Sequence, residues 1–328
     1  MNVSKDAYFT QIEGGWYLVD GESRTYFDAE YLIDYIGGKY NCPFPEFLRD
    51  ELTEGQAHWK ERGWGYALPQ YSDSLKVIYK DSAGENGDIV RYNTFISYIK
   101  ENNQADDLPL IGARKLDGLF ESPDVGAPFS PSILLNRYTA RKFSGKVIDL
   151  RILTSIISSA LGSIYRLRKY TRDSSDPRRF SSSFGSSFEI AICIYNVCGI
   201  ENAIYFIDFK EGCLVQTRKG DYRTDVCDVI QKQTPPLSGN ATFIIVADFY
   251  KWQWRYRHEK ALRNLFIEAG RVAQDIIISS ERHGLKAFPT PAISDSLCDE
   301  LLDVPPARFN AIYTITIGRV DREYLQAE

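Results

Sequence analysis

The chain has 328 residues, of which 44% are hydrophobic and 25% charged, and its formal net charge is −5. This composition is typical of globular proteins and excludes intrinsic disorder, collagen-like repeats and low-complexity chains. The small acidic excess argues against a general nucleic-acid binder, which usually carries an excess of Lys and Arg. The length favours about two domains.

The cysteines and histidines are few and scattered. The six cysteines form no Cys-x-x-Cys pair and the three histidines form no cluster with them, so we expect no zinc site. The N-terminus has no basic head before an apolar run, and no stretch approaches about 18 consecutive apolar residues. We therefore expect a cytoplasmic protein with reduced cysteines, no metal and no membrane span.

The first part of the chain predicts a small α+β module over residues 1–100. Apolar runs at 8–12 and 16–19 flank Gly14-Gly15, which predicts two strands joined by a turn. The spacing of apolar residues over 26–36 predicts a helix. A further helix is predicted over 45–52, and strands are predicted over 75–80 and 88–92. Residues 101–133 then hold four prolines among polar residues, which is typical of an interdomain linker.

The second part, residues 134–328, has more regular patterns. The sequence predicts a helix over 150–161 that ends at Gly162, and a long helix over about 260–282 that ends near Gly284. Near-continuous apolar runs of strand length lie at 188–195, 202–208, 241–248 and 311–318. Such runs indicate strands that are buried on both faces. We expect a sheet covered by helices, hence an α+β fold.

Three segments carry residues suited to chemistry. Arg137 and Arg141 stand four apart before a helix, and guanidinium groups match phosphate oxygens, although a solvated surface segment has the same pattern. The small residues of 181–183 allow close approach of a flat ligand, or form a flexible loop. Aromatic and cationic residues alternate over 252–263, as in a substrate channel or in the start of an amphipathic helix. Serine-hydrolase, dinucleotide and P-loop motifs are absent from the sequence.

Taken in order, these segments resemble the nitroreductase-like flavin oxidoreductases, and among them the peptide azoline dehydrogenases of ribosomal-peptide maturation. The resemblance runs from about Leu135 to Val320. Its landmarks are Arg137-x-x-x-Arg141-x-Phe143, Arg179 with the small-residue loop before Phe188-Glu189, Ala203 to Asp208, Arg263 through Glu268-Ala269-Gly270-x-x-x-Gln274, Gly284-Leu285, and Ile317-Gly318-Arg319.

The resemblance implies a nitroreductase-like mixed sheet flanked by helices, a bound FMN, and a dimer whose interface builds the flavin site. It implies that the FMN phosphate is held by Arg137 and Arg141 with Arg319, and that Ser181, Ser182 and Ser183 lie against the flavin ring. Tyr138 and Gln274 fall within the same motifs and join the expected cofactor-binding residues. The flavin would supply the redox chemistry.

The expected proton acceptor is altered in this chain. Azoline dehydrogenases have a Lys-Tyr pair fourteen and thirteen residues before the glycine that matches Gly270, and here Tyr256 and Arg257 occupy those positions. Arginine is too basic to accept a proton readily. Three alternatives remain: Tyr256 acts alone, a one-residue slip makes Arg255 and Tyr256 the functional pair, or this subunit has lost the base.

The resemblance therefore implies an FMN-dependent dehydrogenase that oxidises a ribosomally made precursor peptide. The expected partners are that peptide, a second identical or related subunit, and a cyclodehydratase. The N-terminal module resembles winged-helix elements that bind a leader peptide as an added strand, with a structural cap as the alternative. Two other functions stay open, namely a general NAD(P)H nitroreductase or quinone reductase, and a non-catalytic subunit that pairs with a related flavin-bearing partner.

Overall fold

The structure is a computed structural model of the chain. It describes residues 8–12, 15–20, 23–27, 93–94, 96–98, 100–101, 108–112, 114–121, 126, 128–171, 185–256, 261–305 and 308–321. The chain divides into two compact units, residues 1–83 with 258–260, and residues 84–257 with 261–328. The helix predicted after Pro45 and the strands predicted near residues 75–80 and 88–92 lie outside the described residues.

The first unit contains a three-stranded antiparallel sheet of β1 (Tyr8–Ile12), β2 (Gly15–Asp20) and β3 (Ser23–Phe27), in that order. The two strands predicted from the sequence are confirmed. The helix predicted to begin at Tyr26 is wrong over its first residues, because Tyr26 lies in β3 opposite Tyr17. Asp20 pairs with Ser23, so the chain reverses there, and cross-strand pairing outweighs the helical spacing.

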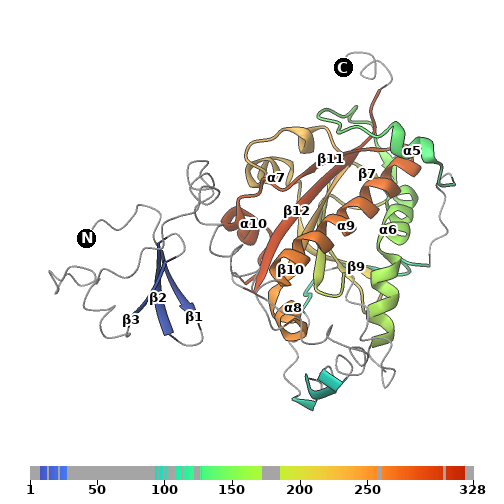
Figure 1. Ribbon diagram of the computed structural model, residues 1–328. Helices are drawn as coiled ribbons and strands as arrows, with labels where there is room; N and C mark the ends of the chain where they lie inside the picture. Colours follow the sequence, from blue (N-terminus) through green and yellow to red (C-terminus); the bar gives the residue numbers. More distant parts are fainter. Residues whose placement is uncertain are drawn as a thin grey trace. The chain divides into compact units, whose positions relative to one another are not determined.

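The second unit is built on a seven-stranded sheet in the order β11-β12-β10-β6-β8-β9-β4 (Figure 1). All its described pairings are antiparallel. A short parallel pair, β5 (Ile148–Asp149) with β7 (Val197–Cys198), lies beside it. The sheet strands are β4 (Arg114–Leu116), β6 (Phe188–Ile194), β8 (Ala203–Asp208), β9 (Cys213–Lys219), β10 (Ala241–Asp248), β11 (Lys286–Thr290) and β12 (Phe309–Gly318).

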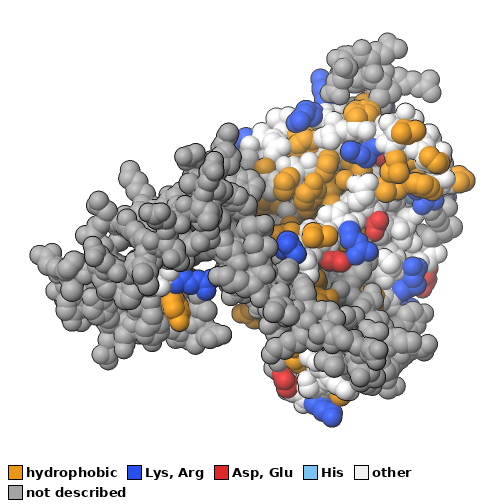
Figure 2. All heavy atoms as spheres, in the orientation of Figure 1, with side chains coloured by type: hydrophobic (Ala, Val, Ile, Leu, Met, Phe, Trp, Pro, Cys, Tyr) orange, Lys and Arg blue, Asp and Glu red, His pale blue; other side chains and the backbone are white. Residues whose placement is uncertain are grey.

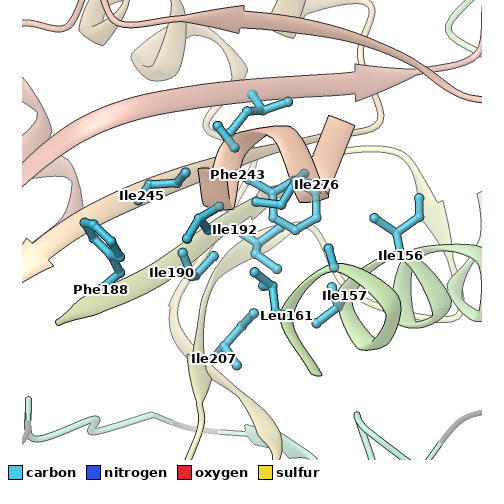
Figure 3. Close-up of a cluster of buried hydrophobic side chains, with 14 of the residues drawn as sticks. Ile156, Ile157, Leu161, Phe188, Ile190, Ile192, Ile207, Phe243, Ile245 and Ile276 are labelled. Atoms are coloured by element: carbon cyan, nitrogen blue, oxygen red, sulfur yellow. The ribbon is translucent and has the colours of Figure 1, made fainter. Parts of the chain in front are cut away.

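Two long helices cover one face of this sheet. They are α6 (Leu150–Thr171) and α9 (Ala261–Arg282), which contact each other. Because side chains alternate across a strand, Ile190 and Ile192 of β6 point to this face together with Phe243 of β10. Figure 3 shows these side chains meeting the apolar stripes of both helices. The result is the larger of the two hydrophobic cores.

Shorter helices cover the opposite face. These are α7 (Arg223–Val229) and α10 (Asp295–Leu302), and their buried residues pack with the alternate residues of β6, β8 and β10, such as Cys193, Phe206 and Ile244. The remaining elements are α5 (Pro131–Leu135), α8 (Phe249–Arg255) and a 3₁₀ turn at Pro235–Leu237. The sheet is thus buried on both faces, which confirms the expected α+β fold.

Three features differ from the sequence predictions or extend them. The helix predicted to end at Gly162 continues to Thr171, because Leu161 and Ile164 are fully buried and their packing outweighs the roughly 1 kcal/mol cost of a helical glycine. Within the expected linker 101–133, β4 pairs with β9 at the edge of the sheet. Among the described helices, none has the length and apolar character needed to cross a membrane.

Candidate functional site

The two arginines expected to bind phosphate lie beside the first residues of β11. Thr139, midway between Arg137 and Arg141, forms a parallel bridge with Ala287. The backbone N–H of Ala140 donates to the carbonyl of Ala287 at 3.0 Å. Both arginines have exposed side chains. Although about 150 residues separate these segments in the sequence, the fold holds them side by side.

Arg319 joins the same region from the end of β12. Its carbonyl accepts a hydrogen bond from the N–H of Ser144 at 2.7 Å, and its own N–H donates to Oδ1 of Asn240 at 3.3 Å. Gly318 allows this approach, because a Cβ there would lie 2.8 Å from the ring of Phe143. The structure therefore places Arg137, Arg141 and Arg319 on neighbouring segments.

Tyr138 lies within this cluster, and two charged residues that the sequence analysis missed lie beside it. Nζ of Lys286 is 4.7 Å from the centre of the Tyr138 ring and donates to Oε2 of Glu281 at 2.7 Å. Arg137 acts electrostatically on the same carboxylate. Lys286 and Glu281 gave no sequence signal, because each is one charged residue at the end of an amphipathic element.

The donor set of this region fits a phosphate group. Three arginines with exposed side chains stand on two segments that are hydrogen-bonded to each other, and guanidinium forks match phosphate oxygens in geometry. We name Arg137, Arg141 and Arg319 the arginine cluster.

Among the other predicted site residues, the structure describes Gln274 and Tyr256. Gln274 is on the exposed face of α9, one turn after Gly270, where a Cβ would meet nothing within 4 Å. Ser181, Ser182, Ser183 and Arg257 lie outside the described residues.

Tyr256 is described and has a specific environment. It follows the last residue of α8, and its ring centre is 4.5 Å from that of Trp252. Nε of Arg255 donates to the Tyr256 hydroxyl oxygen at 3.2 Å. Nε1 of Trp252 donates to the carbonyl of Ala261, the first residue of α9, at 2.9 Å. Of the alternatives raised by the sequence, the pairing of Arg255 with Tyr256 is therefore present as a contact.

The structure does not bring Tyr256 together with the arginine cluster. Tyr256 lies by the first residue of α9 through Trp252, whereas Arg137 lies by Glu281 near its last residue. A helix of 22 residues is about 33 Å long at 1.5 Å per residue. Within one chain the two groups are therefore at opposite ends of α9.

A buried ionic cluster lies near the start of α8, and the sequence analysis did not predict it. Glu189 of β6 accepts from Nη1 of Arg168 at 3.0 Å and from Nζ of Lys251 at 3.0 Å. Burial alone raises the pKa of Glu189, but the charges and hydrogen bonds of Arg168 and Lys251 outweigh burial and leave that pKa lowered. The carboxylate therefore stays ionised inside the protein.

A second carboxylate extends this cluster. Asp248 is fully buried, accepts from Nη2 of Arg308 at 2.9 Å, and caps α8 by accepting from the N–H groups of Tyr250 and Lys251. Arg168 also donates to the carbonyl of Ser186. The ionic cluster thus fixes the start of α8 to the sheet.

Comparison with known proteins identifies the family to which this chain belongs. Residues 134–319 match the model of the Nitroreductase family, whose proteins are flavoproteins. The fold is thus that of a family of flavoprotein oxidoreductases. Because the match spans more than half of the chain, this protein belongs to the nitroreductase family.

Two relatives extend the comparison. The Trifolitoxin operon protein TfxC of Rhizobium leguminosarum bv. trifolii is 25% identical over 280 residues, which are 79% of this chain and 73% of TfxC. The crystal structure of a nitroreductase of Anabaena variabilis has a TM-score of 0.51 at 18% identity. That match covers 69% of this chain and 47% of the other, so the chain spans about half the length of that structure.

Proposed function

We propose that this chain is an FMN-dependent dehydrogenase that oxidises a ribosomally made precursor peptide, converting an azoline to an azole or oxidising a related backbone bond. The observation that carries the proposal is the arginine cluster, which offers the donors that a flavin mononucleotide phosphate requires. Similarity to a protein of the trifolitoxin operon supports a role in the maturation of a natural product.

The arginine cluster and Tyr256 would have separate roles in cofactor binding and in proton transfer. FMN, when bound, supplies the acceptor for two electrons and a hydrogen. Arg137, Arg141 and Arg319 hold its phosphate. In its deprotonated, phenolate form, Tyr256 would take the proton that accompanies hydride loss from the substrate. Arg255 already donates to the Tyr256 oxygen, and such a contact strengthens when that oxygen is negative.

Because Tyr256 and the arginine cluster lie at opposite ends of α9, we infer that two chains build each site. Tyr256 and the arginine cluster are about 30 Å apart in one chain, so Tyr256 of one copy would serve the FMN held by another identical or related subunit. Large apolar side chains are exposed on α9 and α5, which contact each other, as expected for a face that another subunit covers. Figure 2 shows hydrophobic side chains gathered on this face. The exposed large apolar side chains of α5 and α9 are those of Leu134, Leu135, Phe266 and Ile267.

Subunit complementation tests this arrangement. One variant carries Arg137→Ala with Arg141→Ala, the other carries Tyr256→Phe, and each is expected to be inactive toward the precursor peptide alone. After co-refolding at equal amounts, half of the dimers are mixed, and each contains one intact site. We expect about a quarter of the wild-type activity. No recovery in the mixture, with mixed dimers demonstrated by differential tags, would refute the two-chain site.

The dimer face has its own test. Ile267→Asp is expected to dissociate the dimer and to lower FMN affinity, as measured by light scattering and by flavin fluorescence. Leu297→Asp is the control, because Leu297 is also exposed but lies on α10, which covers the face of the sheet opposite to α9. Equal behaviour of the two variants would contradict the assignment of this face.

The N-terminal sheet is proposed to recognise the leader part of the precursor. Both β1 and β3 are edge strands among the described residues of this sheet, and an extended peptide can add to such an edge through main-chain hydrogen bonds. A fluorescent full-length precursor should bind the whole chain, with or without a cyclodehydratase partner, more tightly than the same peptide without its leader. Equal affinities would contradict leader recognition.

A second candidate function follows from position 257, where the dehydrogenase pattern would have a tyrosine and this chain has arginine. A subunit without the proton acceptor would pair with a related flavin-bearing protein. In that case the Tyr256→Phe variant keeps full activity in the assembled complex. Steady NADH oxidation with small nitroaromatic compounds and no peptide would instead favour the general nitroreductase.

A further inference from the structure

The pair formed by Glu281 and Lys286 connects the end of α9 to the arginine cluster. Nζ of Lys286 donates to Glu281 at 2.7 Å and to the carbonyl of Asn136, directly before Arg137, at 3.2 Å. The side chain of Glu281 is 7% exposed and that of Lys286 is 19% exposed. A lysine ammonium has three N–H donors, and these contacts account for two of them.

The buried position of the Glu281 carboxylate is unfavourable for the stability of the folded protein. Its Oε1 is buried and has no hydrogen-bond partner among the described residues. Burial raises the pKa of Glu281, although Lys286 and Arg137 act in the opposite direction. An unsatisfied buried oxygen costs about 1–3 kcal/mol, and a hydrophobic pair is often at least as stable as a buried ion pair. Stability alone therefore does not explain why these two residues are present.

We propose that Lys286 is a fourth cation of the phosphate site and that Glu281 is the counter-ion that limits the affinity of this site. The inference rests on the proposed function, in which Arg137, Arg141 and Arg319 hold the phosphate of a flavin mononucleotide. Lys286 lies against the Arg137–Tyr138 segment, and ammonium groups bind phosphate as compact charges. Glu281 balances Lys286 when the site holds no anion and repels the phosphate when it does.

The two residues should then affect binding with opposite signs. Lys286→Met removes a cation next to a dianion and is expected to weaken FMN binding about tenfold. Glu281→Gln keeps a hydrogen-bond acceptor for Lys286 and removes the repulsion, so it should tighten FMN binding several-fold. Riboflavin lacks the phosphate, so its affinity should be unchanged in both variants.

The test is a titration of the full chain, together with its partner subunit where one is needed, with FMN and with riboflavin, followed by flavin fluorescence. The measured quantity is the ratio of the two dissociation constants. Lys232→Met is the matched control, because Lys232 forms an exposed ion pair with Asp228. Lys286→Met leaves the buried carboxylate of Glu281 without its cation and could impair folding. The double variant Glu281→Gln/Lys286→Met leaves no uncompensated buried charge, so it tests the loss of Lys286 without that defect.

The outcomes separate this inference from the proposed function. A lower FMN preference in both variants that contain Lys286→Met, with a higher one in Glu281→Gln, supports the inference. Equal changes for FMN and riboflavin, or weaker FMN binding by Glu281→Gln, would overturn it and leave the flavin assignment intact. If the wild-type chain with its partner binds neither flavin, the proposed function itself is refuted.

Discussion

Replacing Glu189 by Gln should destabilise the protein strongly, because Glu189 is the centre of the buried ionic cluster. The carboxylate is 6% exposed and contacts two cations at 3.0 Å. The cluster holds Arg168, Lys251 and Arg308 against Glu189 and Asp248. The substitution raises its net charge from +1 to +2, since three cations then face one carboxylate.

The magnitude follows from the burial of this pair. Removing one partner of a buried ion pair costs about 3–5 kcal/mol, because the remaining charge stays in a medium of low polarity. For a folded unit of about 200 residues each 1 kcal/mol shifts Tm by about 2–4 °C. We therefore expect Tm of Glu189→Gln to fall by roughly 6–20 °C at pH 7.

The pH dependence supplies the sharper check. The folded state lowers the pKa of Glu189 below its ordinary value of 4.5. The stabilisation is therefore fully present above about pH 4.5 and is lost as the pH falls through the folded pKa. Thermal unfolding of both proteins from pH 7 to pH 3, monitored by circular dichroism, should show a Tm difference that shrinks below pH 4.5.

Glu201→Gln is the control for this experiment. Glu201 also has two cations near its carboxylate, Lys219 and Arg114, both at 3.2 Å, but these pairs are largely exposed. Exposed pairs contribute little to stability, so Tm should barely change. A loss below about 1 kcal/mol in Glu189→Gln at pH 7, or a Tm difference independent of pH, would refute the reasoning.

Three other predictions concern packing and reactivity. Ile276→Ala, in the fully buried core between α9 and the sheet, should lower the free energy of unfolding in urea by about 2–5 kcal/mol. Gly185→Ala should cost about 1–3 kcal/mol in the same assay, because φ is +68° and a Cβ would lie 2.4 Å from Ile164. Burial raises the pKa of Cys298 to about 12, so iodoacetamide at pH 8 should label the exposed Cys198 well before Cys298, as read by peptide mass mapping.

The central strands could be predicted from the sequence because their environment is uniform. β10 (Ala241–Asp248) coincides with its predicted range, since all eight residues are buried between two helical layers. β11 (Lys286–Thr290) escaped prediction, because it is short and contains Pro289. A strand of this sheet is clearest in the sequence when it is long and both of its faces are covered.

The ionic cluster illustrates a limit of a different kind. Glu189 is visible in the sequence as one charge in a run of apolar strand residues, which signals a buried partner. Its partners Arg168 and Lys251 are 21 and 62 residues away in the chain. Local patterns cannot reveal such partners, because only the fold brings Arg168 of α6 and Lys251 of α8 to Glu189 of β6.

The division of the expected site is the most informative difference between sequence and structure. A motif order places Arg137, Tyr256 and Arg319 in one set, but it carries no distances. The length of α9 gives the distance between these groups. The first residue of α9 is hydrogen-bonded to Trp252, which contacts Tyr256, and Glu281 in the last turn of α9 lies beside Arg137. A rigid helix of about 33 Å cannot let both ends touch one mononucleotide. Two groups that one chain keeps this far apart can act on one ligand only if a second chain supplies one of them.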